Sequence, residues 1–192
     1  MLFSVDNFKQ NVLKKGLARL NNFEVVISPP ASLAGAWDTR NDISLMCEST
    51  TLPQLSISVR PLKIFGPSHQ RPHAIEFGGE GLPFTFLVDQ NMTQKKFFDQ
   101  WMASIVDFEQ FTVNLNDNYK TTIQIYQLDN QSKRVYAIEL LEAFPRSMNM
   151  MELNQGSRDQ FHRCNVNFTF RRWRPLTGFT NSGKNSTFTD VN

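Results

Sequence analysis

The chain has 192 residues, a length that fits one domain with extensions and is sufficient to bury a hydrophobic core. Its 20 Lys and Arg residues against 18 Asp and Glu residues leave a formal charge of +2, far below the basic excess of proteins that bind nucleic acid through charge alone. There are 17 Phe residues although the hydrophobic fraction is only 40%, so a few large side chains must fill much of the core. This composition favours a sheet-rich protein with an extensive polar surface.

The first half of the chain predicts one short helix and several strands. Ser4 is placed as the N-cap of a helix that stops at Gly16. Alternating apolar residues predict strands over 21–28, 43–49 and 56–64, the last with Ile57 and Val59 facing inward. Segments 30–42 and 65–71 are expected to be loops, because small and polar residues, glycine and proline are frequent in them.

The second half contains the clearest helix and the clearest hairpin. Phe97, Trp101 and Ile105 recur every four residues within a helix expected over 94–106, and their apolar face should cover the sheet formed by strand 82–88 and its neighbours. Residues 120–142 predict a hairpin around a turn at 129–132. The last expected strand, 165–173, alternates apolar and polar residues, so one face can join the core while the other contacts something polar.

No motif predicts catalysis or metal binding. The glycine-rich segment 78–81 precedes a strand pattern and not the helix that a phosphate-binding loop requires. His69 and His73 would share a face only on a helix, which the neighbouring prolines disfavour, and the pair of His162 and Cys164 lacks further ligands. We therefore expect a non-enzymatic protein without a cofactor or a bound metal.

Targeting and redox signals are equally sparse. The N-terminus shows no basic segment followed by an apolar run, so we expect no secretory signal. No apolar stretch has the length needed to cross a bilayer, and we expect no membrane insertion. Cys47 and Cys164 are then expected to be reduced thiols.

Three blocks of sequence follow one another in an order that is more specific than any block alone. They read CESTTLP at 47–53, FTFLVD at 84–89 leading to FFDQW at 97–101, and EAFP at 142–145 followed by VNFTFRRW at 166–173. This order resembles the tail tube proteins of contractile-tailed bacteriophages of the T4 type. The resemblance spans roughly residues 17–174.

The resemblance implies an α+β, mainly β fold: an antiparallel β-sandwich or barrel with a flanking amphipathic helix, whose strands join neighbouring subunits into a hexameric, ring-shaped barrel. The rings would stack into a tube inside a tail sheath, with baseplate and tail-terminator proteins at the ends and genome DNA passing through the channel without sequence-specific binding. The protein would be part of the virion and would be assembled in the host cytoplasm. Its expected parts are an N-terminal helical extension (1–16), a tail-tube β domain (17–174) and a flexible or partner-ordered C-terminal tail (175–192).

Three groups of residues are candidate sites of assembly. The polar side of the hairpin would line the channel or contact a neighbouring subunit, through Thr122, Gln124, Tyr126, Lys133 and Glu139. A second segment would reach another ring or subunit, through Leu52, Pro53, Ile57, Val59 and Ile64. The core between helix and sheet would contain Phe97, Trp101, Ile105, Phe168 and Phe170. Deleting residues 54–70 is then expected to leave a folded monomer that cannot polymerise.

Two other functions stay open from the sequence. A baseplate tube-initiator protein of the same family would nucleate the tube, and it would carry extensions such as residues 1–16. A nucleic-acid-binding module would use the basic cluster Arg171, Arg172, Trp173 and Arg174. In a chain of nearly neutral charge, such a short cluster is more often a solvated strand end or one half of a salt bridge.

Overall fold

The computed structural model describes residues 5–63, 65–78, 81–156 and 160–176. Ser4, expected to cap the first helix, and the tail from 177 onward lie outside the described residues. The helices and helical turns are α1 (Val5–Lys15), η1 (Ala31–Leu33), η2 (Thr39–Ile43), η3 (Ser44–Met46), α2 (Thr93–Ile105) and α3 (Asn116–Tyr119). The strands are β1 (Phe23–Ile27), β2 (Cys47–Thr50), β3 (Ser56–Leu62), β4 (His69–Glu76), β5 (Leu82–Leu87), β6 (Thr121–Leu128), β7 (Arg134–Met148), β8 (Arg163–Thr169) and β9 (Arg172–Pro175).

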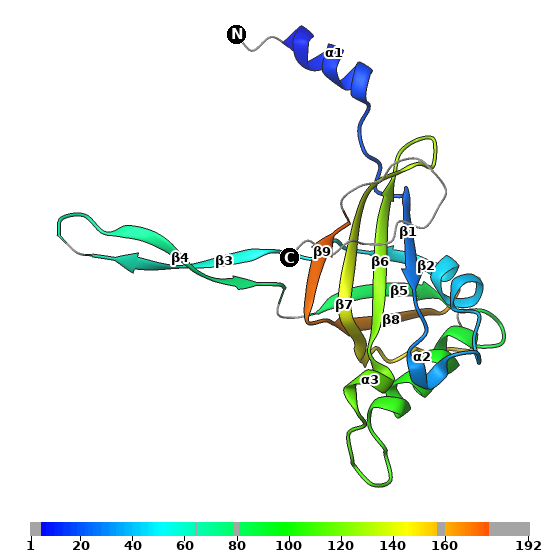
Figure 1. The fold of residues 1–192 in the computed structure, drawn as a ribbon. Coiled ribbons are helices and arrows are strands. Elements are labelled where there is room, and N and C mark those ends of the chain that lie inside the picture. The colour runs from blue at the N-terminus through cyan, green and yellow to red at the C-terminus, as the bar shows by residue number, and fades with distance from the viewer. Residues whose placement is uncertain (1–4, 64, 79–80, 157–159, 177–192) are drawn as a thin grey trace.

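The body of the protein is an antiparallel sheet folded over on itself. Its strand order is β1-β6-β7-β8-β5-β2, with β9 paired to β7 outside this path. The first half of β7 pairs with β6 and β9, and its second half pairs with β8. The long strand therefore belongs to both layers, which Figure 1 shows crossing each other at a steep angle. Within the described residues the path does not close, because β1 and β2 each pair along one edge only.

The bend in β7 occurs at Glu142, whose φ of 55° lies in the left-handed region. The register against β6 shifts at the same point, which marks a β-bulge that turns the strand from one layer into the other. Three residues later Pro145 is tolerated, since this half of β7 pairs with β8 alone and the missing N–H removes no ladder bond on the free edge.

The core lies between the two layers and is closed by α2. Alternate residues of β5 and β8 point inward, and the fully buried rings of Phe86 and Phe168 meet those of the helix. The ring centroids of Phe86 and Phe98 lie 5.0 Å apart, and those of Trp101 and Phe168 lie 5.6 Å apart. The Trp101 indole also donates a hydrogen bond of 2.8 Å to the carbonyl of Tyr119, which ties α2 to α3.

Two elements extend away from this body in different directions (Figure 1). One is α1, whose Val5, Phe8 and Leu13 side chains are exposed. The other is the hairpin of β3 and β4, a separate two-stranded sheet in which every residue of β4 is exposed. A two-stranded hairpin is only marginally stable in water by itself. Both elements therefore present surface that a single chain leaves uncovered.

The expected fold class is confirmed: the protein is mainly β, antiparallel, with a flanking amphipathic helix. The helix expected over 94–106 is α2, and the hairpin expected over 120–142 is formed by β6 and β7. Gly16 has a φ of 71° and donates to the carbonyl of Val12, so it ends α1 as expected.

Four expectations were wrong. The strand expected over 43–49 begins only at Cys47, because 39–46 form helical turns and the Ser44 hydroxyl accepts a hydrogen bond from the Ile27 amide at the end of β1. Ile57 and Val59 do not face inward, since they are 55% and 53% exposed. Their alternation defines one face of a strand, but no layer formed by the described residues packs against that face.

The other two errors concern strand ends. Residues 65–71 are not all loop, because β4 begins at His69. Pro72 lies within β4 at a register shift, where a missing amide is tolerated. The single strand expected over 165–173 is two strands, β8 and β9. Between them the chain changes layers, and the Arg171 amide donates to the carbonyl of Leu141.

Candidate assembly surfaces

The outer face of the layer formed by β1, β6, β7 and β9 carries a connected polar network. Gln124 donates to Glu139 across the strands at 3.0 Å and accepts from the Tyr126 hydroxyl at 2.6 Å. Arg174 of β9 donates to the other carboxylate oxygen of Glu139 at 2.8 Å. Burial of Tyr126 raises the pKa of its hydroxyl. Thr122 shares this face and is half-buried.

An ion pair at the edge of this face extends the network. The guanidinium of Arg134 contacts the carboxylate of Glu24 at 2.9 Å and lies 3.9 Å from the ring centroid of Tyr126. Lys133 is exposed in the turn between β6 and β7. Most charges on the face are thus matched within the chain, which leaves little net positive potential to hold phosphate groups.

Glu142 fixes the place where the two layers meet. Its carboxylate contacts the Lys120 ammonium at 2.6 Å and the Arg171 guanidinium at 2.7 Å. Hydrogen bonds from Lys120, the larger contribution, and from Arg171 lower the pKa of Glu142 to about 2. Lys120 precedes β6 and Arg171 lies between β8 and β9, so a single carboxylate joins the bend of β7 to segments of both layers.

The hairpin of β3 and β4, hereafter the arm, contains Ile57 and Val59 of the second candidate group. Ile57 lies opposite Ile75, and both are exposed. Leu52 and Pro53 lie in the segment that precedes the arm, while Ile64 lies outside the described residues. The base of the arm is attached to β9, because the Trp173 indole donates to the Gln54 carbonyl at 3.3 Å and its ring lies edge-on to that of Phe77.

The third candidate group lies where the first layer, the second layer and α2 meet. Phe97, Trp101 and Phe168 are fully buried, and the half-buried Ile105 and Phe170 pack against the same cluster. These residues hold the body together by packing the helix against both layers.

Comparison with known proteins decides the family. A family model described as phage tail tube protein matches residues 18–175. The chain belongs to the phage tail tube protein family. This confirms the resemblance found in the sequence, which spanned nearly the same residues. Because the family is one of structural proteins, this tail tube protein is a structural protein and not an enzyme.

Solved structures share the fold of this tail tube protein at low sequence identity. A chain of the sheath–tube complex of the extracellular contractile injection system PVC, in its extended state, is 13% identical with a TM-score of 0.61, and the match covers 91% of this chain and 99% of that chain. The tube-terminating cap of the anti-feeding prophage gives 12% identity and a TM-score of 0.62, with 85% and 93% covered. A chain of the baseplate of the anti-feeding prophage is 16% identical with a TM-score of 0.59, and the match covers 84% of this chain and 97% of that chain. Curated protein sequences yield no match.

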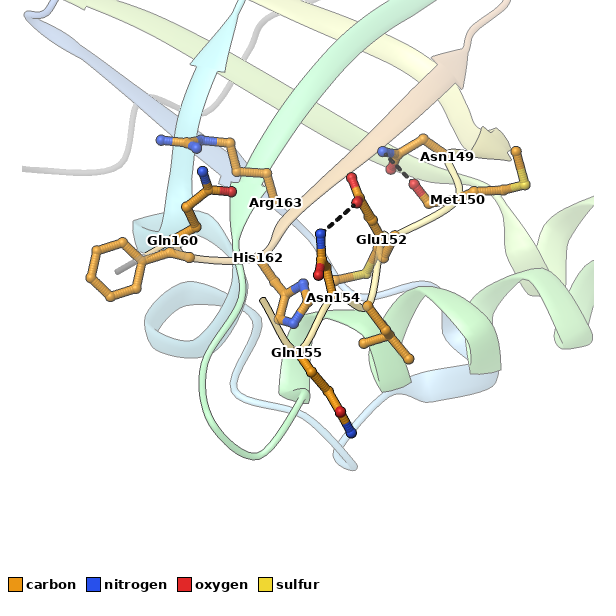
Figure 2. Close-up of a pocket in the computed structure, with 11 residues that line it drawn as sticks. Asn149, Met150, Glu152, Asn154, Gln155, Gln160, His162 and Arg163 are labelled. Carbon is orange, nitrogen blue, oxygen red and sulfur yellow. Dashed lines mark hydrogen bonds between the residues drawn. The ribbon is translucent and has the colours of Figure 1, made fainter. Parts of the chain in front are cut away.

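One surface hollow of this tail tube protein does not have the character of an active site. Figure 2 shows it between the segments 149–155 and 160–163, next to β8. It is open to solvent, and the side chains of Met150, Leu153 and Phe161 along it are exposed. Asn154 donates to Glu152 at 3.4 Å, but the residues that the structure describes contain no group of three His, Cys, Asp or Glu side chains able to hold a metal.

The basic cluster of the tail tube protein is largely used within the chain. Arg171 pairs with Glu142 and Arg174 pairs with Glu139, while Trp173 packs at the base of the arm. These contacts favour the salt-bridge interpretation of the cluster over the nucleic-acid-binding module. Arg172 is exposed.

Both cysteines of the tail tube protein are free thiols, as the sequence predicted. Burial raises the pKa of Cys47 to about 12 and that of Cys164 to about 11, so neither is a reactive thiolate at neutral pH. Within the described part of the chain, no helix is long and apolar enough to span a membrane.

Two surface features were not predicted from the sequence. Strand 56–64 was predicted, but its partner β4 was not, because β4 contains a proline, two histidines and no buried face; the matching positions of Ile57 and Ile75 around a central Gly-Pro turn were a usable signal. The loop over 106–118 was also missed, although its mixture of acidic and large apolar residues is visible in the sequence.

Proposed function

We propose that this chain is the repeating subunit of the inner tube of a contractile phage tail, in which six copies form a ring and stacked rings enclose a channel for the genome. The proposal rests chiefly on the family match over 18–175. Similarity to chains of tube, cap and baseplate structures is similarity of fold, and it favours a position within a tube without choosing among the positions.

The open strand path supports assembly through the sheet. β1 and β2 each leave one edge unpaired in the described residues, and an unpaired edge is prone to join another chain. Closing the sheets of several subunits into one large barrel would remove these edges. The polar network around Glu139 would then face the channel or a neighbouring subunit, and its matched charges would not retain passing phosphates.

The arm supports contacts beyond the sheet. It exposes Ile57, Val59 and Ile75, which no other described segment covers, so its burial in an assembly would contribute favourable free energy. We propose that it reaches a neighbouring subunit or ring. In this proposal residues 1–16 and 175–192 are extensions around a tail-tube domain at 17–174.

The expected partners follow from a place inside the tail. They are a sheath outside the tube, baseplate and terminator proteins at its ends, and DNA that passes without sequence-specific binding. The protein would reside in the virion after assembly in the host cytoplasm. Negative-stain electron microscopy of the purified protein tests the central claim, because rings with six subunits and stacked tubes are expected, whereas a protein that stays monomeric at high concentration would contradict it.

Replacing the arm separates assembly from folding. Deleting 54–70 would leave residues 71–76 of β4 without their partner strand and would remove the Gln54 carbonyl that accepts from Trp173. A cleaner change replaces 56–76 with a short Gly-Ser turn, because Ser56 and Glu76 are paired and their backbones are about 5 Å apart. The variant is expected to remain folded by circular dichroism and to form no tubes. Tube growth equal to that of the wild type would refute a role of the arm.

A further inference from the structure

The outer half of the arm is cationic. Arg60, Lys63 and Arg71 lie in this half, and no Asp or Glu occurs between 60 and 71. Arg60 and Arg71 are directly opposite each other in the pairing of β3 with β4. Like charges at opposed positions destabilise a hairpin. Neither arginine forms a salt bridge with a carboxylate of the described residues, so no ion pair in that part of the chain relieves the repulsion.

A second projection carries the complementary character. The loop 106–118 leaves the end of α2 and returns through α3, and its exposed side chains are apolar, acidic or neutral polar. The exposed apolar residues are Phe108, Phe111, Val113 and Leu115. Asp107, Glu109 and Asp117 supply three carboxylates, while the segment contains no Lys or Arg. The charged side chains of the loop are negative, whereas those of the outer half of the arm are positive. Both the loop and the arm expose large apolar side chains.

The loop is held in one shape. Val106 and Val113 form an isolated β-bridge, and one carboxylate oxygen of Asp107 accepts the amides of Glu109 and Gln110. At the other end, the Tyr119 carbonyl accepts the hydrogen bond from the Trp101 indole. A surface fixed in this way loses little conformational entropy on binding.

The arm and the loop lie at different ends of the molecule and point in different directions (Figure 1). They therefore meet only between copies. We propose that the outer half of the arm of one copy docks on the loop 106–118 of another copy, with Arg60 and Arg71 next to Glu109 and Asp117. A strand of seven residues extends the arm by about 23 Å, which is enough to reach across to a neighbouring subunit.

The contact joins different surfaces of the two copies, so it is heterologous and propagates into a ring or a stack. This inference rests on the proposed tube function. It goes further by naming the two surfaces that meet and the charges that hold them together. Charge complementarity sets the register of such a contact and speeds association, while the apolar residues supply the buried area.

Charge reversal tests the pairing. The arm variant R60E/R71E keeps two like charges facing each other, so the stability of the hairpin itself changes little. The loop variant E109K/D117K leaves Asp107 and its turn intact. Each variant alone is expected to raise the critical concentration for assembly about tenfold at low salt, an effect that shrinks as salt screens exposed charges. The combination of both is expected to assemble nearly as well as the wild type.

The matched control reverses charges on α1, with K9E/K14E. It is expected to gain nothing from E109K/D117K. If reversal of the arm has no effect, or if the combined variant assembles no better than the single ones, the pairing is refuted while a wild type that forms tubes upholds the proposed function. Rescue of K9E/K14E by the loop variant would assign the loop to α1 and overturn the proposal.

Two further outcomes are decisive. If R60E/R71E disturbs folding, the neutral variant R60Q/R71Q tests the same pairing and is expected to show a smaller loss of assembly. Salt-sensitive binding of duplex DNA by the wild type that R60E/R71E abolishes, without a change in assembly, would make nucleic acid the partner of the arm and refute docking between copies.

Discussion

Among core positions, Trp101 should be the one at which a substitution destabilises the protein most. Its side chain is fully buried, and its ring lies within 5.6 Å of both the Phe97 and the Phe168 ring centroids. Its N–H donates to the Tyr119 carbonyl at 2.8 Å. The substitution Trp101→Phe keeps an aromatic ring in place but removes this donor and part of the ring area.

The expected cost follows from two contributions. A buried carbonyl left without its donor costs about 1–3 kcal/mol. The smaller ring leaves a cavity and weakens aromatic contacts, for about 1 kcal/mol more. Trp101→Phe should therefore lower the free energy of unfolding by about 2–4 kcal/mol, a large part of the stability of a typical domain.

Trp37 provides a matched control. Its indole donates to Gln100 at 3.0 Å, but this bond is exposed to solvent, so water can replace it after Trp37→Phe. We expect a loss of at most about 1 kcal/mol for the control. Urea unfolding followed by far-ultraviolet circular dichroism measures both variants without relying on tryptophan fluorescence. Equal losses in the two variants would refute the claim that the buried hydrogen bond of Trp101 stabilises the junction of α2 and α3.

Two further predictions concern the sheet. Gly81→Ala should destabilise the protein more than Gly35→Ala in thermal unfolding: both glycines have positive φ, but a Cβ at Gly81 would lie 2.7 Å from a side-chain oxygen of β8, whereas Gly35 has nothing within 4 Å. Similar losses would contradict the steric argument. Glu142 has its pKa lowered from 4.5 to about 2, so its ion pairs contribute stability above pH 4.5 that is lost as the pH falls toward 2. Glu142→Gln should flatten the acid limb of a stability-against-pH curve, and an unchanged limb would argue against these pairs.

The predictions from sequence succeeded where the chemistry is local. The spacing of Phe97, Trp101 and Ile105 predicted α2, because an apolar stripe with helical period has only one way to be buried. The turn after Leu128 predicted the hairpin of β6 and β7. The same reasoning failed for Ile57 and Val59, since alternation shows that a strand has an apolar face but not whether anything in the chain covers it.

The candidate surfaces were predicted in part. The polar side of β6 was visible as alternation, yet the pairing of Gln124 with Glu139 and of Glu139 with Arg174 depends on strands far apart in the sequence. Arg171 belonged to a basic cluster in the sequence, and only the bend of β7 brings Glu142 next to it. A residue with positive φ in the middle of a strand has no reliable signature when it is not glycine.

The sequence by itself determined the family, the mainly β class, the covering helix and the absence of a recognisable catalytic motif, because these depend on periodicity and on the order of short motifs. The tertiary structure decided how the long strand β7 serves two layers, which charges neutralise one another, and which apolar residues remain uncovered. Burial and ion pairing depend on distances between segments that are remote in sequence, and the fold alone sets those distances. The tertiary structure was needed to recognise the arm and the loop 106–118 as matching surfaces, because it shows both of them exposed and projecting from the body in different directions.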